Sequence, residues 1–388
     1  MKKAKSQSAV APVRVPLCKP YISEDEKLAA AEVLRSGWLM QGPRTDEFEG
    51  LVADFVGVKY AIAVNSGTSA LTLALMAAGL SAGEKTIVPS YSFVATANST
   101  LHWGGEPIFV DIGREDYNLD PSKIEQAVDS KTRAIVVVHQ FGFAADMDPI
   151  MAIAEERGLL VIEDAACSLG TSYRGKKTGS FGEAACLSFH PRKVITTGEG
   201  GMVLTDSEKI ARRVRVQRNH GLAASEKNAT ARCVEAGHNY RMTDIQAAIG
   251  VVQLGKLDEI IGHRTRLAAR YEETISALPA LRLPKWPEGS IPNYQSFAAE
   301  LADESIDREA LLDFMKERGI GCAPGIWPIH LQPAYAEKHS NDRLPQTLRA
   351  ARRSFFLPLY PGMADDEQEF VLSTLKEALV ELSTEKET

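Results

Sequence analysis

The chain has 388 residues, of which 51 are acidic and 44 basic, giving a formal net charge of −7. This balance argues against a nucleic-acid partner, because phosphate backbones are bound by clustered positive charge. Five scattered cysteines without a C-x-x-C pair argue against a disulfide framework or a metal site. No run reaches the ~18 apolar residues of a membrane span, and the basic N-terminus lacks the apolar run of a signal peptide. We therefore expect a cytoplasmic protein without membrane contact.

Strands and helices alternate regularly after a flexible tail at residues 1–16. Helices are predicted over residues 24–36 and after the turn at Gly42 and Pro43. Five apolar runs then predict strands at 59–64, 85–89, 106–112, 134–139 and 159–164. Helical segments separate them at 69–79, 92–103, 121–128 (with Asp120 as N-cap) and 147–158. Nearly continuous Val, Ile and Leu in such strands predicts an α/β fold with a buried, mostly parallel sheet.

The pattern changes after two further strands at 183–189 and 200–205. A long helical stretch at 241–278, bent near Gly250 or Gly262, is the expected connector. Beyond it a strand at 293–301 and helices near 307–318 and 365–383 indicate a smaller α+β domain. The expected domains are the tail 1–16, a large domain 17–255 and a small C-terminal domain 256–388.

Four stretches carry residues suited to chemistry, each with a plain structural alternative. Asn65-Ser66-Gly67-Thr68 leads from a strand into a helix, whose free N–H groups suit a phosphate. Taken alone, a simple N-cap turn is the better interpretation. Asp164 ends an apolar strand, where open α/β sheets bind ligands; the alternative is an acidic N-cap.

Lys193 comes five residues after Ser188, at the end of a strand, and precedes a glycine-rich loop. A lysine near a desolvated sheet edge has a lowered pKa and can form an imine. The alternative is a surface lysine before a glycine turn. Tyr91 and Phe93 follow another strand end, where either could lie against a planar ring, although core packing is the more common use of such aromatic residues.

These four stretches together suit one cofactor. A phosphate cradle, an aromatic face, a carboxylate and an imine-forming lysine are what pyridoxal 5′-phosphate (PLP) requires. A nicotinamide cofactor would need G-x-G-x-x-G between strand and helix, and VNSGTSAL does not supply it.

Longer motifs carry a family resemblance over nearly the whole chain, from about Pro16 to the segment 357–363. GPRTDEFEGLVADFVGVKYAIAVNSGTSALTLAL, VHQFGFAADMD, VIEDAACSLG, SFHPRKVITTGEGGMVLT, RNHG and HNYRMTDIQAAIG resemble the DegT/DnrJ/EryC1/StrS sugar aminotransferase family. The resemblance implies a PLP enzyme of fold type I, the aspartate aminotransferase-like fold. It also implies a homodimer with shared active sites.

The resemblance also implies roles for individual residues. Lys193 would be the Schiff-base lysine, Asp164 the partner of the pyridine nitrogen and Phe93, rather than Tyr91, the stacking ring. The remaining cofactor contacts would be Gly67, Thr68 and Ser188 on the phosphate, with Asn239 reaching the phosphate of the neighbouring subunit. His190, His220 and His330 are weaker candidates for substrate contacts. Cys167 stands where many members have Gln or His, so the bond of that position to the cofactor's phenolic oxygen is not expected here.

The expected reaction is a ping-pong transamination. L-Glutamate would give its amine to the cofactor, and a keto group of a nucleotide-linked sugar would then receive it, with Lys193 as tether and proton carrier. A dehydratase branch of the family has His in place of this lysine, so Lys193 favours transamination. A sugar dehydratase, an aminocyclitol aminotransferase and a non-catalytic regulatory relative stay open as alternatives.

Overall fold

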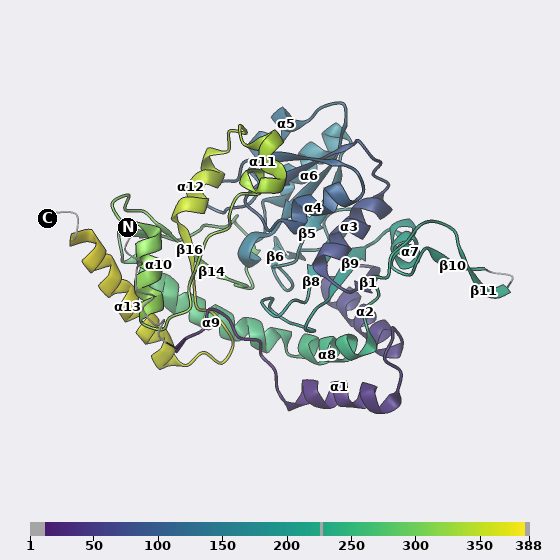
Figure 1. Ribbon diagram of the computed structural model, residues 1–388, viewed down its shortest axis with the longest axis horizontal. Coiled ribbons are helices and arrows are strands. Elements are labelled where there is room, and N and C mark those ends of the chain that lie inside the picture. The colour runs from purple at the N-terminus through teal and green to yellow at the C-terminus, as the bar shows by residue number, and fades with distance from the viewer. Residues whose placement is uncertain (1–11, 226–227, 385–388) are drawn as a thin grey trace, which may run out of the picture.

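The computed structural model describes residues 12–225 and 228–384, arranged around a seven-stranded sheet (Figure 1). The strand order is β1-β9-β8-β5-β4-β2-β3. The strands are β1 (Tyr60–Val64), β2 (Lys85–Pro89), β3 (Glu106–Val110), β4 (Thr132–Val138), β5 (Leu160–Asp164), β8 (Ala184–Ser188) and β9 (Gly201–Thr205). β9 runs in the direction opposite to the other six strands, which are all parallel to one another. The predicted α/β fold with a mostly parallel sheet is therefore confirmed.

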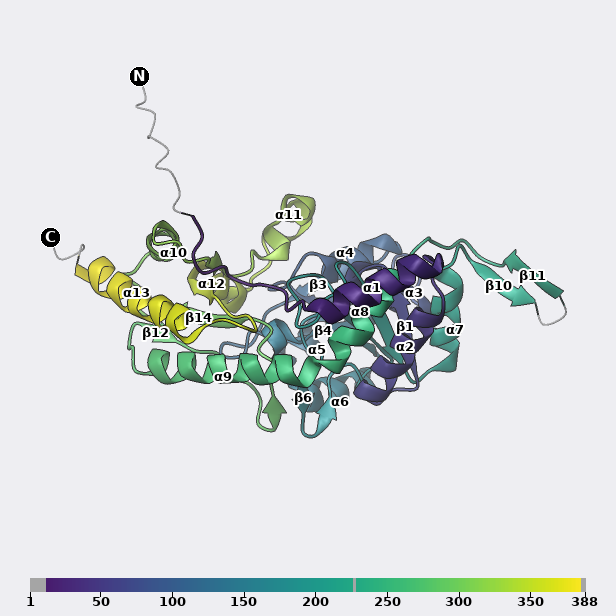
Figure 2. The ribbon, with the colours of Figure 1, turned by 90° about the horizontal axis from the view of Figure 1, so that it is seen from below.

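Helices pack around the sheet, with α1 in an outer layer, and most of them lie where the apolar spacing predicted them (Figure 2). They are α1 (Glu24–Ser36), α2 (Pro43–Val56), α3 (Gly67–Ala78), α4 (Ala95–His102), α5 (Ile124–Ala127), α6 (Met147–Arg157) and α7 (Glu208–Gln217). Asp120 caps the segment before α5 by accepting from the Ser122 amide, as predicted. α7 was not predicted, although its buried Ile210, Ala211 and Val214 have the spacing of an amphipathic helix.

The long helical stretch is two helices, α8 (Asp244–Gly255) and α9 (Leu257–Ser276), that meet at Lys256. The predicted bend at Gly250 or Gly262 is therefore wrong. Gly250 instead allows close packing, because a Cβ there would lie 2.6 Å from the Phe48 ring. Lys256 leaves the helical conformation, and its ammonium donates to Ser23 Oγ at 2.6 Å, at the start of α1.

A second sheet, in the C-terminal part, has the order β12-β14-β16-β15 and is antiparallel throughout. Its strands are β12 (Leu281–Arg282), β14 (Phe297–Leu301), β15 (Ala323–Pro324) and β16 (Ser354–Leu357), accompanied by α10 (Arg308–Glu317), α11 (Pro333–His339), α12 (Pro345–Arg353) and α13 (Asp365–Thr384). The predicted strand at 293–301 is shorter at its start, and α11 and α12 were not predicted. Tyr91 and Phe141 share one apolar cluster with Tyr271 and Phe355, so the domain division at residue 255 stays a prediction.

The N-terminal strap, defined here as residues 12–23, runs from the C-terminal part of the molecule to α1 (Figure 2). Val15 is fully buried and pairs in parallel with Ile320. The amides of Arg14 and Val15 both donate to the carbonyl oxygen of Gly319. The end of the predicted flexible tail is thus packed, whereas residues 1–11 lie outside the described residues.

Smaller strands complete the fold. β13 (Ser290–Ile291), β6 (Ser172–Tyr173) and β7 (Lys176–Lys177) form a three-stranded sheet, and β10 (Leu222–Ser225) and β11 (Asn228–Cys233) form a hairpin that extends away from the body (Figure 1). Within residues 12–225 and 228–384, no helix combines the length and apolarity needed to span a membrane. In the same residues, no cluster of three or more His, Cys, Asp or Glu side chains is placed to hold a metal ion.

Candidate active site

The ends of β1, β8 and β5 bring the predicted site residues to one edge of the sheet. Val64 at the end of β1 and Ser188 at the end of β8 both pair with Gly201 of β9. Gly67 therefore lies against Ser188, and a Cβ at position 67 would be 2.8 Å from the Ser188 Cβ. Glycine at this position lets the start of α3 approach β8 more closely than any side chain would allow.

The first turn of α3 forms an anion-binding corner. Ser66 caps the helix by accepting from the Ser69 amide at 3.1 Å. Within the part of the chain that the structure describes, the amides of Gly67 and Thr68 have no acceptor. Free amides at a helix N-terminus, together with the helix dipole, favour a phosphate. Gly67 and Ser188 thus lie together, and the phosphate contacts of Gly67, Thr68 and Ser188 stay a prediction.

Asp164 ends β5, with 6% of its surface exposed. Its Oδ2 accepts from Thr96 Oγ1 at 2.8 Å, and its Oδ1 accepts from the Ala166 amide at 3.3 Å. Because the Thr96 proton goes to Asp164, Ser92 Oγ must donate to Thr96 Oγ1, 2.8 Å away. Burial raises the pKa of the Asp164 carboxyl, although the Thr96 bond and the Lys193 charge act in the opposite direction. The ionised carboxylate is therefore short of stabilising partners.

Glu163, one residue earlier, has the opposite surroundings. Its Oε2 accepts from the Gly179 amide at 2.7 Å and lies 2.9 Å from His139 Nε2, and its Oε1 accepts from the amides of Phe181 and Gly182. The Ala145 amide donates to His139 Nδ1, so Nε2 carries the proton and donates to Glu163. Burial opposes ionisation, but the bond from His139 and the backbone bonds prevail, and the pKa of Glu163 is lowered.

Lys193 lies in the turn after β8, where its amide donates to the His190 carbonyl at 2.8 Å. Its Nζ donates to Cys167 Sγ at 3.1 Å. The Lys193 charge is also one of the influences that lower the Asp164 pKa. The two side chains are therefore close enough for their charges to interact, and Cys167 is in contact with the amine.

The two aromatic candidates separate clearly. Tyr91 is fully buried and its hydroxyl lies 2.6 Å from Ser354 Oγ; burial raises its pKa to about 12. Tyr91 is thus a core residue. Phe93, which precedes α4, is 71% exposed and is available for a ligand. Asn239 is also exposed, and its backbone pairs with Asn219.

The three histidines have different settings. His190 Nδ1 accepts from the Arg192 amide at 3.2 Å, beside Lys193. His220 is exposed, with a left-handed backbone φ of 57°. His330 is 1% exposed, and the Ser90 hydroxyl, which accepts from the His330 amide, lies 2.6 Å from its Nδ1. This burial argues against the predicted substrate contact of His330.

The sequence patterns did not identify three neighbours of the site. Thr96 and Ser92 bond toward Asp164 from α4 and the loop before it, and a hydroxyl in a helical pattern gives no sign of such a partner. Arg192 comes directly before Lys193. The conformation of this turn sets the direction of the Arg192 side chain, and the sequence alone does not show that direction.

Comparison with known proteins identifies the family of this chain. Residues 20–376 match the model of the DegT/DnrJ/EryC1/StrS aminotransferase family. The chain belongs to this family. It is 35% identical over 375 residues to the spore coat polysaccharide biosynthesis protein SpsC of Bacillus subtilis, covering 94% of this chain and 96% of SpsC.

Solved structures agree with this assignment. DesV of S. venezuelae is 32% identical, with a TM-score of 0.87 over 95% of this chain and 98% of DesV. Spr1654 of Streptococcus pneumoniae, solved in its PMP-form, is 25% identical with a TM-score of 0.90 over 96% of this chain and all of Spr1654. The chain is thus an aminotransferase of the sugar aminotransferase family, and PLP is its cofactor.

The residues present fit this cofactor. The corner at Gly67 would be filled by a single Cβ, and its free amides suit the phosphate group. Asp164, whose ionised form is short of partners, suits a protonated ring nitrogen. Lys193 presents a primary amine to the same site. Within this family, the amine at position 193 supports an enzyme rather than a non-catalytic relative.

Proposed function

We propose that this enzyme moves the amino group of L-glutamate to a keto group of a nucleotide-linked (deoxy)sugar, giving an amino sugar nucleotide and 2-oxoglutarate. The observation that carries the proposal is the placement of the Lys193 amine, which donates to Cys167 Sγ at 3.1 Å, close enough for its charge to act on Asp164, a buried carboxylate whose pKa burial raises. An amine and a carboxylate of this kind suit imine chemistry on a ring that must stay protonated.

The cofactor would be held at three points. Gly67, Thr68 and Ser188 would hold its phosphate, Asp164 its ring nitrogen and Phe93 one face of its ring. PLP bound there supplies an electron sink for the bonds at the donor's α-carbon. Asp164 keeps the ring nitrogen protonated, because a carboxylate desolvated by burial is stabilised most by a nearby cation.

Lys193 would act twice. Its Nζ would hold the cofactor until the donor's amine takes its place. The freed Nζ would then accept the proton released at the donor's α-carbon and, in the second half of the reaction, return a proton to the carbon of the sugar that receives the amine. The backbone of Lys193 is fixed by its bond to the His190 carbonyl, so this motion is confined to the side chain.

Several observations support the substrate and the assembly. The name of SpsC, a polysaccharide biosynthesis protein, favours a sugar as amino acceptor. The exposed Asn239 and the exposed apolar side chains of Trp38, Leu39 and Met40 favour a homodimer in which a second copy covers them. All five cysteines are free, which favours a cytoplasmic location.

The test is the variant Lys193→Ala, with Lys209→Ala as a matched control on an exposed face of α7. Lys193→Ala should lose the visible absorbance of the tethered cofactor and its glutamate-dependent turnover together, whereas Lys209→Ala should keep both. Normal turnover in Lys193→Ala would refute the proposal. Mass spectrometry of the sugar product distinguishes an added amine from the loss of water that a dehydratase would cause.

A further inference from the structure

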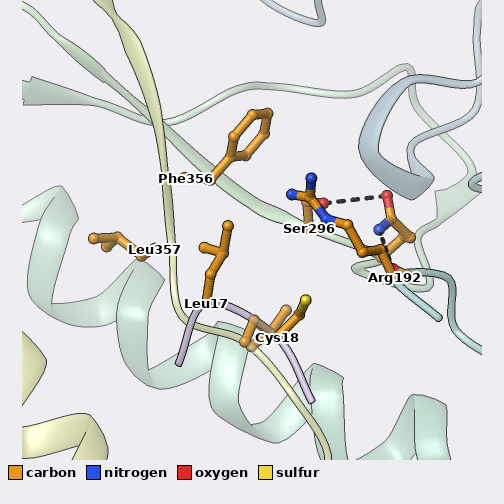
Figure 3. Close-up of a pocket in the computed structure, with 8 residues that line it drawn as sticks. Leu17, Cys18, Arg192, Ser296, Phe356 and Leu357 are labelled. Atoms are coloured by element: carbon orange, nitrogen blue, oxygen red, sulfur yellow. Dashed lines mark hydrogen bonds between the residues drawn. The ribbon is translucent and has the colours of Figure 1, made fainter. Parts of the chain in front are cut away.

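A small cavity lies beside Arg192, the residue before Lys193, between the N-terminal strap and the C-terminal sheet (Figure 3). Its lining includes Leu17, Cys18, Arg192, Gln295, Ser296 and Phe356, and contains no Asp or Glu. About 20 Å³ is open to water-sized molecules, which is room for one or two water molecules. This space suits a group of the size of a carboxylate.

Arg192 provides a positive charge at the cavity, and a hydrogen bond holds its backbone in place. Gln295 Nε2 donates to the Arg192 carbonyl at 2.8 Å, and Ser296 Oγ donates to Gln295 Oε1 at 3.1 Å (Figure 3). In the described part of the chain, the guanidinium has no ion-pair partner. Figure 3 shows it extending toward Ser296 and the cavity. An arginine with a fixed backbone and no acidic partner is suited to an anionic ligand.

A second arginine, Arg264, lies behind the residues that line the cavity. Arg264 is 3% exposed and donates through Nη1 to the carbonyls of Tyr294, Gln295 and Leu359, two of which are lining residues. Its Nε has no hydrogen-bond partner, and no carboxylate among the described residues pairs with it. Burial lowers its pKa to about 10, so it stays protonated at neutral pH. The electrostatic potential that Arg264 produces in the cavity therefore favours a negatively charged ligand.

The cavity and the reacting amine are connected by short segments of the chain, because Gln295 and Ser296 line the cavity and Asn293 lies two residues before Gln295. Asn293 Nδ2 donates to the Cys167 carbonyl at 3.0 Å, and Cys167 Sγ accepts from Lys193 Nζ at 3.1 Å. Arg192 and Lys193 are consecutive, with Cα atoms about 3.8 Å apart. An amino acid carries its amine and its α-carboxylate on one carbon. A small anion pocket beside the lysine is thus placed for the carboxylate of the amine's donor.

We propose that Arg192 and this cavity bind a carboxylate of the amino-acid donor. The inference rests on the proposed transamination and adds to it the site that selects the donor. The donor is then an amino acid rather than a simple amine, and the sugar nucleotide binds elsewhere in the cleft.

The test uses the PLP-loaded enzyme and two readouts. The first is calorimetric binding of glutarate, a dicarboxylate without an amine that cannot react. The second is the glutamate concentration that gives half-maximal conversion of the cofactor absorbance. Arg192→Gln should weaken both about 10- to 100-fold, the range expected for a charge-assisted bond. Arg192→Lys should recover part of the loss, and Arg352→Gln, an exposed arginine of α12, should behave like the parent enzyme.

The outcomes separate this inference from the function on which it rests. Unchanged glutarate binding in folded Arg192→Gln, checked by its melting temperature, would overturn the inference even if transamination is real. A variant that weakens the sugar nucleotide but not glutamate would assign Arg192 to the diphosphate, and would also overturn it. If the parent enzyme binds glutarate through Arg192 but never converts with glutamate, the proposed function fails while the anion site stands.

Discussion

Two neighbouring carboxylates on β5 differ in how the protein surrounds them. Glu163 accepts three backbone amides and the Nε2 proton of His139, and its pKa is lowered. Asp164 accepts one hydroxyl and one long amide bond, and its pKa is raised. Both are buried, and because they are adjacent on a strand they face opposite sides of the sheet.

The difference shows how to tell a structural acid from a functional one. A buried carboxylate that the fold supplies with donors contributes to stability, whereas one left with few donors is stabilised when a ligand brings a cation. By this criterion Glu163 belongs to the scaffold and Asp164 to the cofactor site. The sequence pair Glu-Asp gives no hint of which is which.

Asp164→Asn tests the functional side and should have the largest effect. Without the carboxylate the ring nitrogen loses its charge partner, and glutamate-dependent turnover should fall about 10²–10³-fold. Steady-state kinetics with saturating PLP measures this. Turnover within a few-fold of the parent enzyme would show that Asp164 does not face the ring nitrogen.

Glu163→Gln tests the structural side. One carboxylate oxygen becomes an amide NH₂, so about two of its donors lose their acceptor, and the free energy of unfolding should fall by about 3 kcal/mol. Denaturant unfolding of the cofactor-free protein measures the change. If the variant unfolds like the parent but has lost turnover, Glu163 acts on the chemistry and the contrast with Asp164 is wrong.

The pH dependence of stability should differ in sign between the two acids. The folded pKa of Glu163 is lowered, so its stabilisation is present above its unfolded pKa of ~4.3 and is lost as the pH falls through the folded value. The folded pKa of Asp164 is raised, so its ionisation at neutral pH costs stability in the cofactor-free protein.

Melting temperatures of the cofactor-free variants from pH 3 to 8 check these signs. Asp164→Asn should melt above the parent protein near pH 7, by about 1–3 °C, and should lose this advantage below about pH 4. Glu163→Gln should melt below the parent near pH 7 and approach it at low pH. Shifts of the same sign for both variants would contradict the assignment.

Thr96→Val should have the smallest effect. It removes the hydroxyl that donates to Asp164 Oδ2 while keeping the shape of the side chain, so the affinity for PLP should fall about 10-fold. Thr96→Ser, which keeps the hydroxyl, should restore most of it. Fluorescence titration of the cofactor-free protein with PLP measures the affinity of each variant. Equal PLP affinities of Thr96→Val and Thr96→Ser would rule out a role for the hydroxyl.

The sequence predicted the features that depend on local patterns. Strands buried on both faces must be apolar throughout, so 159–164 and 183–189 were found, and the residues that end them, Asp164 and Ser188, came with them. The family resemblance added the roles of single residues such as Asn239, which stay predictions.

Features that depend on distant contacts were not predictable in this way. Thr96 and Asp164 are 68 positions apart, and no periodicity links a helix hydroxyl to a strand end. β12 and β15 have two residues each, too few to show an alternation. The joint at Lys256 depends on the bond of its ammonium to Ser23, whereas the glycines that suggested a bend serve close packing or face open space.

The N-terminal strap limits how the front end of this protein can be engineered. Val15 is paired with Ile320, and Ser23 receives the ammonium of Lys256 at the junction of α8 and α9. A shortened version that begins after Val15 would keep α1 but lose the backbone pairing with Ile320. Reporter fusions at the front end should therefore leave residues 12–23 intact.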